Sequence, residues 1–178
     1  EIDARERLEY RSGDMRDFNF VERFDAIIMP FTTVFCLTDV EKSACFKRVF
    51  THLNPGGVFA LDTYCPAVFD DPDWANDDAL EPLTTIIDGE RSVEVSEMTV
   101  VDQEARIARV TYGHEIGEDA GQHLWCEYVI EHHYCSTDEL ASRLAASGFA
   151  DVVASAGFSA KTQGPEAERV VLVARRSA

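Results

Sequence analysis

Apolar runs alternate with one amphipathic segment in the first third of the chain. A continuous apolar run over residues 26–31 is expected of a strand that is buried on both faces of a sheet. Residues 38–57 carry apolar side chains at helical spacing, with Thr38 or Asp39 as the cap, until an Asn-Pro-Gly-Gly stretch ends the pattern. A second apolar run over residues 57–64 follows at once. This order predicts a β-α-β unit of parallel strands with a right-handed crossover.

The pattern changes after the second apolar run. Residues 66 to about 88 are polar and rich in proline and aspartate, which predicts an irregular surface segment that acts as a lid. Strand-like stretches separated by turn signals then predict an antiparallel meander, and they cover residues 91–102, 105–116 and 122–135. A helix with a capping box and two further strands complete the chain at residues 136–149, 151–157 and 168–176.

These elements together indicate one domain of the α/β class. Strands that alternate with helices predict a Rossmann-like, mostly parallel sheet with helices on both faces. The antiparallel meander is then an insertion into this domain. The chain has 178 residues, which is enough for one domain with a substantial core.

Composition narrows the classes of partner. The formal net charge of −17 argues against nucleic acid, because nucleic-acid binding depends on Lys and Arg that neutralise phosphates. No apolar stretch approaches the length of a membrane span, and the charged start of the chain does not resemble a signal peptide. The five cysteines follow no CxxC spacing and are interpreted as core residues. We therefore expect a cytoplasmic protein that acts on a small molecule. A homodimer is one assembly that the sequence leaves open.

A charged cluster lies at Tyr10–Phe20, where the sequence reads YRSGDMRDFNF. The stretch RLEYRSGDM, residues 7–15, is predicted to contain a short strand, and this strand ends at Gly13. The aspartates, arginines and methionine of the cluster are compatible with a catalytic site or a metal site. They are equally compatible with a solvated turn in which Asp14 and Arg16 form an exposed ion pair.

The stretch HLNPGGVFALDTY, residues 52–64, resembles the motif that precedes the fifth strand in class I S-adenosylmethionine-dependent methyltransferases. Other stretches follow the order of that superfamily: YRSGDMRDF is similar to its third strand and adenine-contacting loop, FDAIIMPF to its fourth strand, STDELASRLAASGF to its last helix and ERVVLVARR to its seventh strand. The resemblance implies one methyltransferase-like domain over residues 1–178 that is incomplete at its N-terminus. The lid and antiparallel insert, residues 66–135, would cover the substrate side, as in small-molecule N- or O-methyltransferases.

The resemblance also implies S-adenosylmethionine as the cofactor and assigns residues to it. Asp14 would accept a hydrogen bond from the adenine amino group, Met15 would pack on the ring, and Arg16 would frame the pocket. Asp3 resembles the acidic residue that grips the ribose. The remaining cofactor-binding candidates follow the fourth strand of the superfamily and flank the transferred methyl group: Pro30 and Phe31.

Candidates for the acceptor side come from three parts of the chain. The predicted substrate-binding residues are Thr32, Phe35, Tyr64, Trp125 and Tyr128, and Asp62 either lines the same pocket or caps a turn. Imidazole titrates near neutrality, so a general base is sought among His114, His132 and His133. The histidines and cysteines of the meander follow no established ligand spacing, and no metal site is predicted.

One part of the superfamily's pattern is absent from the sequence. The chain contains no GxGxG, which in the superfamily holds the methionine part of the cofactor. This absence keeps a second hypothesis open, namely a methyltransferase-like binding or dimerisation module without catalysis. A third hypothesis is a nicotinamide-dependent oxidoreductase on a similar sheet, which would need a glycine fingerprint of its own.

Overall fold

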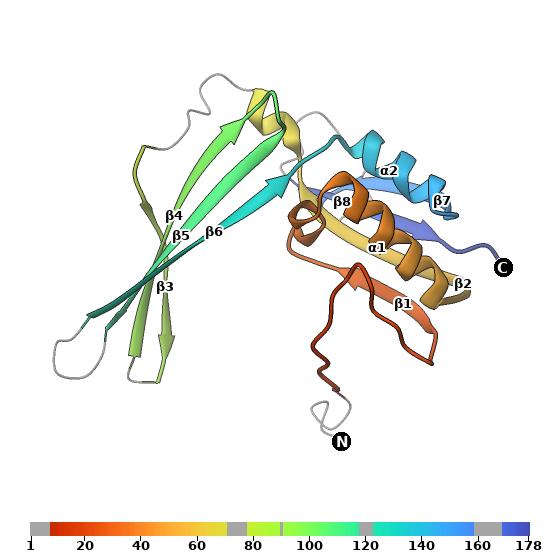
Figure 1. The fold of residues 1–178 in the computed structure, drawn as a ribbon, viewed down its shortest axis with the longest axis horizontal. Coiled ribbons are helices and arrows are strands. Elements are labelled where there is room, and N and C mark those ends of the chain that lie inside the picture. Colours follow the sequence, from red (N-terminus) through yellow and green to blue (C-terminus); the bar gives the residue numbers. More distant parts are fainter. Residues whose placement is uncertain (1–7, 71–77, 90, 118–122, 159–168) are drawn as a thin grey trace.

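The strands form two four-stranded sheets that lie side by side along the long axis of the protein (Figure 1). The computed structural model describes residues 8–70, 78–89, 91–117, 123–158 and 169–178. The core sheet has the strand order β1-β2-β8-β7, with bounds Phe24–Met29, Leu53–Tyr64, Arg169–Arg175 and Ala150–Ala156. The meander has the order β3-β4-β5-β6, with bounds Glu81–Asp88, Arg91–Asp102, Ile107–Gly117 and His123–His133.

The predicted β-α-β unit is confirmed. Strands β1 and β2 are parallel, and helix α1, Asp39–His52, connects them. Thr38 caps α1 in a capping box with Glu41, and Ser136 caps helix α2, Thr137–Ala146, in the same way. Each box satisfies backbone N–H groups that a helix start leaves unpaired, which is why these polar residues fix where the helices begin.

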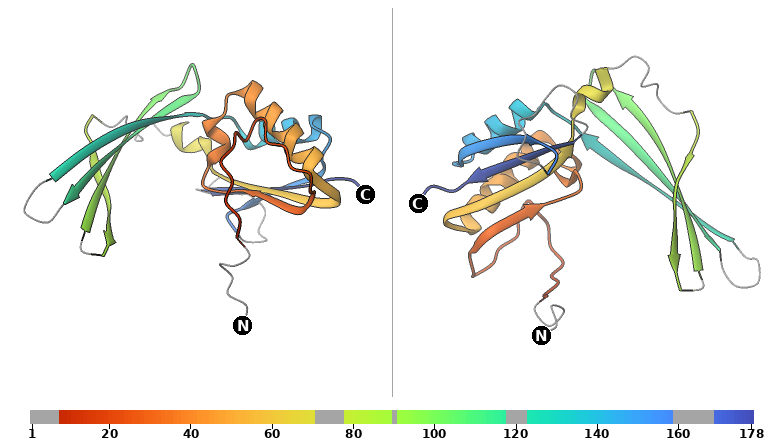
Figure 2. Two further views of the ribbon diagram at one scale, coloured as in Figure 1. Left: turned by 60° about the horizontal axis from the view of Figure 1, so that its bottom comes forward. Right: turned by 180° about the vertical axis from the view of Figure 1, so that it is seen from behind.

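The prediction of a mostly parallel sheet with helices on both faces is correct only in part. Among the described residues, β1–β2 is the parallel pair of the core sheet, whereas β8 runs antiparallel to both β2 and β7. Helices α1 and α2 pack against each other on the same face of this sheet (Figure 2). Apolar runs mark buried strands but do not encode the direction of the neighbouring strand, so the sequence pattern overstated the parallel character.

Three local predictions are wrong for related reasons. Strand β1 is not buried on both faces, because it lies at the sheet edge and Ile28 is 72% exposed. Residues 8–14 form no strand, since among the described residues no neighbouring strand pairs with them. Part of the predicted irregular lid, Glu81–Asp88, is strand β3 and pairs with β4, so the meander has four strands instead of three.

The core lies between the core sheet and its two helices. Phe46 of α1 contacts Phe59 of β2, and Phe149 packs on both Phe59 and Phe50 with ring centroids 5.3–5.9 Å apart. Leu140 and Leu144 of α2 are fully buried in the same core. No helix among the described residues is long and apolar enough to cross a membrane.

A buried lysine joins the core helices to the meander. Lys42 of α1 is inaccessible to solvent, and its ammonium group donates a hydrogen bond of 2.6 Å to the carbonyl oxygen of His133 in β6. The same group lies 3.4 Å from the Asp39 carboxylate and 5.8 Å from the centre of the Phe35 ring. Burial lowers the pKa of Lys42, while Asp39 favours its charged form. This contact links α1 of the core to the end of β6.

We predict that Lys42→Ala destabilises the protein by about 2–4 kcal/mol, because it removes a packed side chain and leaves a buried carbonyl oxygen without its donor. Lys47→Ala is the matched control, since Lys47 lies on the exposed side of the same helix. Urea unfolding of both variants tests the prediction. Equal stabilities for the two variants would contradict it.

Candidate functional site

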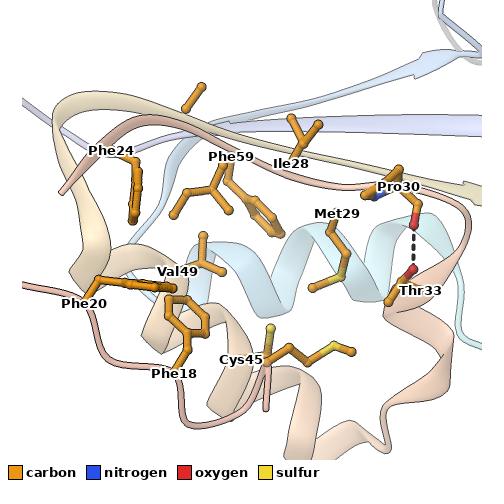
Figure 3. A pocket seen from close by; sticks show the side chains of 13 residues that line it. Phe18, Phe20, Phe24, Ile28, Met29, Pro30, Thr33, Cys45, Val49 and Phe59 are labelled. Atoms are coloured by element: carbon orange, nitrogen blue, oxygen red, sulfur yellow. Dashed lines mark hydrogen bonds between the residues drawn. The ribbon is translucent and has the colours of Figure 1, made fainter. Parts of the chain in front are cut away.

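The turn after β1 has a strained backbone. Phe31 and Thr32 have φ angles of 60° and 58°, a left-handed conformation that side chains with a β-carbon rarely adopt. The carbonyl oxygen of Pro30 accepts a hydrogen bond of 2.6 Å from the Thr33 hydroxyl, which closes the turn (Figure 3). Because such strain costs about 1–3 kcal/mol per residue, it persists only where surrounding contacts impose it, and it clusters at functional sites.

The contact that holds this turn comes from the neighbouring strand. Asp62 of β2 is 5% exposed, and its carboxylate accepts a hydrogen bond of 3.0 Å from the backbone N–H of Phe31. The other carboxylate oxygen pairs with Arg169 of β8. Parallel pairing brings the carboxyl ends of β1 and β2 to one edge of the sheet, so Asp62 can reach the turn directly. Ligands of open α/β sheets bind at that edge.

A pocket of about 460 Å³ opens between this edge and the meander, and we call it the interface pocket. The turn after β1, the end of β2 and the inner face of the meander provide its walls. Its lining residues are Phe31, Thr32, Tyr64, Val68, Phe69, Glu97, Thr99, Ala108, Val110, Tyr112 and His132.

Two polar atoms are buried beside the interface pocket without a hydrogen-bond partner. They are the hydroxyl oxygen of Tyr64 and Nδ1 of His132, and the two rings lie 5.8 Å apart. Burial lowers the pKa of His132, with a smaller contribution from His133, and burial raises the pKa of Tyr64. Both groups are therefore uncharged at neutral pH. Buried polar atoms in proteins nearly always have a partner, so these two indicate a site that a polar ligand or water completes.

A second cavity lies on the other side of the same turn. It has a volume of about 450 Å³ and apolar walls, and it includes Pro30, Thr33 and Cys45 (Figure 3). Met15 also lines it, and Met15 borders the groove in which Asp14 lies. We call it the apolar cavity. Pro30 and Thr33 therefore face the apolar cavity, while the two residues between them face the interface pocket.

Asp14 forms an ion pair with Arg16, which is one of the alternatives that the sequence left open. Both carboxylate oxygens of Asp14 accept hydrogen bonds from the Arg16 guanidinium at 2.6–3.0 Å, and Arg16 also pairs with Glu41. Arg16 lowers the pKa of Asp14 to about 2, through its side chain first and its backbone N–H second. Asp14 is thus a charged group held at the edge of the groove, and Met15 and Pro30 offer an apolar wall that suits an adenine ring. The residues present fit the adenosine end of the predicted cofactor.

The structure brings together some of the predicted site residues. Phe31, Thr32, Tyr64 and His132 meet in the interface pocket. The rings of His114 and Tyr128 stack on each other with centroids 5.3 Å apart. Both residues lie on the face of the meander that borders the interface pocket, but neither lines the pocket itself. Asp3 lies outside the described residues.

Three other predicted residues lie elsewhere. Trp125 is on the opposite face of the meander, where it covers Gly113 so closely that a Cβ atom there would lie 2.3 Å from the indole ring. Phe35 is fully buried in the core and packs against Tyr64 edge-on. His133 does not line the interface pocket, and its carbonyl oxygen contacts Lys42. No group of three or more His, Cys, Asp or Glu side chains suited to a metal ion occurs among the described residues.

Glu97 and Tyr112 are not among the residues predicted from the sequence. These residues lie directly opposite each other on β4 and β5 and point to the interface pocket. Strand alternation predicts that Glu97 and Thr99 share a face. The pairing register between strands decides which partner they meet, and the sequence alone did not reveal it.

Comparisons with known proteins confirm the predicted resemblance to class I methyltransferases, although no protein-family model matches the chain. The cypemycin N-terminal methyltransferase of a Streptomyces species is 38% identical over 63 residues, which are 35% of this chain and 26% of that protein.

Solved structures match over most of the chain. An S-adenosylmethionine-dependent methyltransferase from Clostridium acetobutylicum has a TM-score of 0.76 and 17% identity, with 98% of this chain and 68% of that chain covered. An amino pentose methyltransferase from Micromonospora echinaspora has a TM-score of 0.66 and 25% identity, covering 93% and 63%. A sugar N-methyltransferase from Streptoalloteichus has a TM-score of 0.70 and 17% identity, covering 98% and 66%. The chain thus spans about a quarter of the curated relative and about two thirds of these structures.

We predict that Asp62→Ala lowers the free energy of unfolding by about 1–3 kcal/mol, because the N–H of Phe31 loses its acceptor and the strained turn loses its anchor. Asp25→Ala is a suitable control, since Asp25 accepts a hydrogen bond from Asn54 at an exposed position. Chemical unfolding of the two variants measures the difference. Equal losses would mean that Asp62 does not hold the turn.

We further predict that His132 makes the protein less stable as the pH falls below its ordinary pKa of 6.5. The folded protein has the lowered pKa, so the unfolded chain takes up a proton first and acid favours unfolding. His132→Gln should weaken the decline in stability between about pH 7.5 and 5, which urea unfolding at several pH values measures. An identical decline in both proteins would show that burial does not perturb His132.

Proposed function

We propose that this chain, which has the fold of class I S-adenosylmethionine-dependent methyltransferases, transfers a methyl group from S-adenosylmethionine to an amine or hydroxyl group of a small molecule. One observation carries the proposal: the strained turn at residues 30–33 separates the apolar cavity from the interface pocket. A donor on one side and an acceptor on the other would meet across this turn. Transfer reactions between two bound molecules depend on such proximity.

The names of similar proteins support the same reaction class. The curated relative is an N-terminal methyltransferase, and two of the matching structures are an amino pentose methyltransferase and a sugar N-methyltransferase. Two of the structures described above, those from Micromonospora echinaspora and Clostridium acetobutylicum, are named for binding or using S-adenosylmethionine. The net charge of −17 further favours a small molecule over a nucleic acid as the acceptor.

Several residues would hold the cofactor in this proposal. Met15 would pack on the adenine ring, Asp14, with Arg16 behind it, would accept a hydrogen bond from the adenine amino group, and Pro30 would flank the transferred methyl group. When bound, S-adenosylmethionine supplies a methyl group on a cationic sulfur: the acceptor's lone pair forms the new bond to carbon, and the carbon–sulfur electron pair stays on sulfur. Phe31, which is 86% exposed, offers an aromatic face that can stabilise a cation by about 0.5–2 kcal/mol.

His132 is the residue that can take the proton from the acceptor. Its lowered pKa keeps the imidazole neutral at pH 7, and neutral imidazole accepts a proton. Tyr64, protonated because burial raises its pKa, can donate a hydrogen bond to the acceptor. Burial of the Tyr64 hydroxyl and of His132 Nδ1 also limits water around these two groups.

The meander belongs to the same proposal. In this proposal the whole chain works as one domain, and residues 66–135 cover the acceptor side. The meander also exposes apolar side chains, among them Leu124, Trp125 and Val129, on which a homodimer can form. The proposal keeps the cytoplasmic location and the small-molecule substrate that the sequence predicts.

A second candidate function is a methyltransferase-like binding module without catalysis. Such a module would bind the nucleotide through the same residues, Asp14 and Met15, without transferring a methyl group. A nicotinamide-dependent oxidoreductase is a third candidate, which would need a glycine fingerprint of its own. These candidates differ in which nucleotide they bind and whether they transfer a methyl group.

Calorimetric titration of the protein, as its gene encodes it, with S-adenosylhomocysteine and with NADH tests the proposal. We expect binding of S-adenosylhomocysteine and transfer of a labelled methyl group to an amine or an alcohol. We expect Asp14→Ala to weaken S-adenosylhomocysteine binding roughly tenfold through loss of a charged hydrogen-bond acceptor. Asp17→Ala is the control, because Asp17 pairs with Arg48 on the surface.

Different results would overturn the proposal in different ways. Binding of NADH alone would favour the oxidoreductase. Binding of S-adenosylhomocysteine without methyl transfer to any acceptor would favour the binding module. Equal affinities for the Asp14→Ala and Asp17→Ala variants would show that Asp14 belongs to a structural turn and does not bind the cofactor.

A further inference from the structure

The interface pocket has an uneven distribution of charge. Among the described residues that line it, Glu97 is the carboxylate, whereas His132 is neutral and Tyr64 and Tyr112 keep their protons. No lysine or arginine belongs to that lining set. A ligand with a carboxylate or phosphate would therefore meet a negative group without a compensating cation.

A neighbouring tyrosine holds Glu97 in place. Tyr112 faces Glu97 across the β4–β5 pair, and the interaction of its hydroxyl with the carboxylate contributes to the raised pKa of Tyr112. Burial first, and then the negative charge of Glu97, raises the pKa of Tyr112 to about 12, so this hydroxyl remains a donor. A carboxylate has about four acceptor sites, so Glu97 keeps further capacity for a ligand. The pair thus presents a fixed negative charge at the pocket wall.

Aromatic rings form much of the remaining wall. Tyr64 and Phe69 pack edge to face with centroids 5.4 Å apart, and Phe31 stands at the mouth with an exposed ring. Aromatic faces attract cations and do not attract anions. The carboxylate and the rings therefore favour the same kind of ligand, one that combines a positive charge with apolar surface.

We propose that Glu97, positioned by Tyr112, anchors a protonated amine of the acceptor in the interface pocket and so selects basic amines over neutral alcohols of the same shape. The inference rests on the proposed function, because it names the acceptor class for that site. The net charge of −17 acts in the same direction, since it attracts cationic molecules to the protein before they reach the pocket. Before methyl transfer the anchored amine loses one proton to water, which leaves its nitrogen lone pair free to react.

Binding of two matched probes tests this anchor without any cofactor. Cyclohexylammonium and cyclohexanol have nearly the same shape, but only the first is charged at pH 7. NMR titration of the whole protein gives the dissociation constant of each probe from the shifts of backbone signals around residues 97 and 112. We expect the ammonium ion to bind roughly tenfold more tightly than the alcohol, the effect of one hydrogen bond to a charged group.

Substitutions assign the preference to Glu97. Glu97→Gln keeps the size of the side chain and removes the charge, so it should bring the affinities of the two probes to within about twofold. Glu94→Gln is the matched control on the same strand, because Glu94 is exposed on the opposite face. Tyr112→Phe should weaken binding of the ammonium ion by about threefold, since Glu97 stays charged but loses its fixed orientation.

The outcomes separate this inference from the proposed function. A preference for the ammonium ion that Glu97→Gln removes and Glu94→Gln keeps supports the inference, even if S-adenosylhomocysteine fails to bind and the proposed function falls. Equal binding of both probes to the native protein overturns the inference, even if S-adenosylhomocysteine binds. A preference that survives Glu97→Gln also overturns it. Thermal unfolding of each variant confirms that the titrated protein is folded.

Discussion

The parallel pairing of β1 with β2 is the constraint on which the candidate site depends. It places the ends of both strands at one edge of the core sheet, so that the Asp62 carboxylate reaches the backbone of Phe31. That contact holds two consecutive residues in a left-handed conformation. Without it the turn would relax, and the wall shared by the apolar cavity and the interface pocket would lose its shape. A packed core beneath the edge makes the geometry rigid, because close-packed interiors do not deform continuously.

The second wall of the site depends on how the meander attaches to the core. A long antiparallel sheet that projects from a domain has few contacts to fix its direction (Figure 2). Here Lys42 ties α1 to the end of β6, next to the point where His132 enters the interface pocket. Burying a lysine is costly, and the hydrogen bond to the carbonyl oxygen of His133 and the nearby Asp39 carboxylate offset part of that cost. The pocket therefore depends on two links: Asp62 within the core sheet and Lys42 between the two sheets.

Sequence patterns predicted the local elements well and their assembly only in part. The β-α-β unit, both capping boxes and the antiparallel meander follow from spacing and capping chemistry, which are local properties. Strand direction and register depend on contacts between distant segments, which explains the overestimated parallel character and the missed pair of Glu97 and Tyr112. Trp125 shows the same limit: it was placed on the correct strand, but its face of the sheet is turned away from the interface pocket.

Burial gives the interface pocket its chemical character. The same desolvation that keeps His132 neutral also keeps Tyr64 and Tyr112 protonated, because a low-dielectric environment disfavours every charged form. Glu97, the carboxylate of the pocket lining, is half-buried and faces Tyr112 across the β4–β5 pair. One fixed charge among neutral polar groups and aromatic rings determines the sign of the ligand charge that the pocket favours. His132, the neutral base of the interface pocket, lies two strands across and four residues along the meander from this charge, so recognition of a cation and removal of a proton occupy different parts of the same pocket.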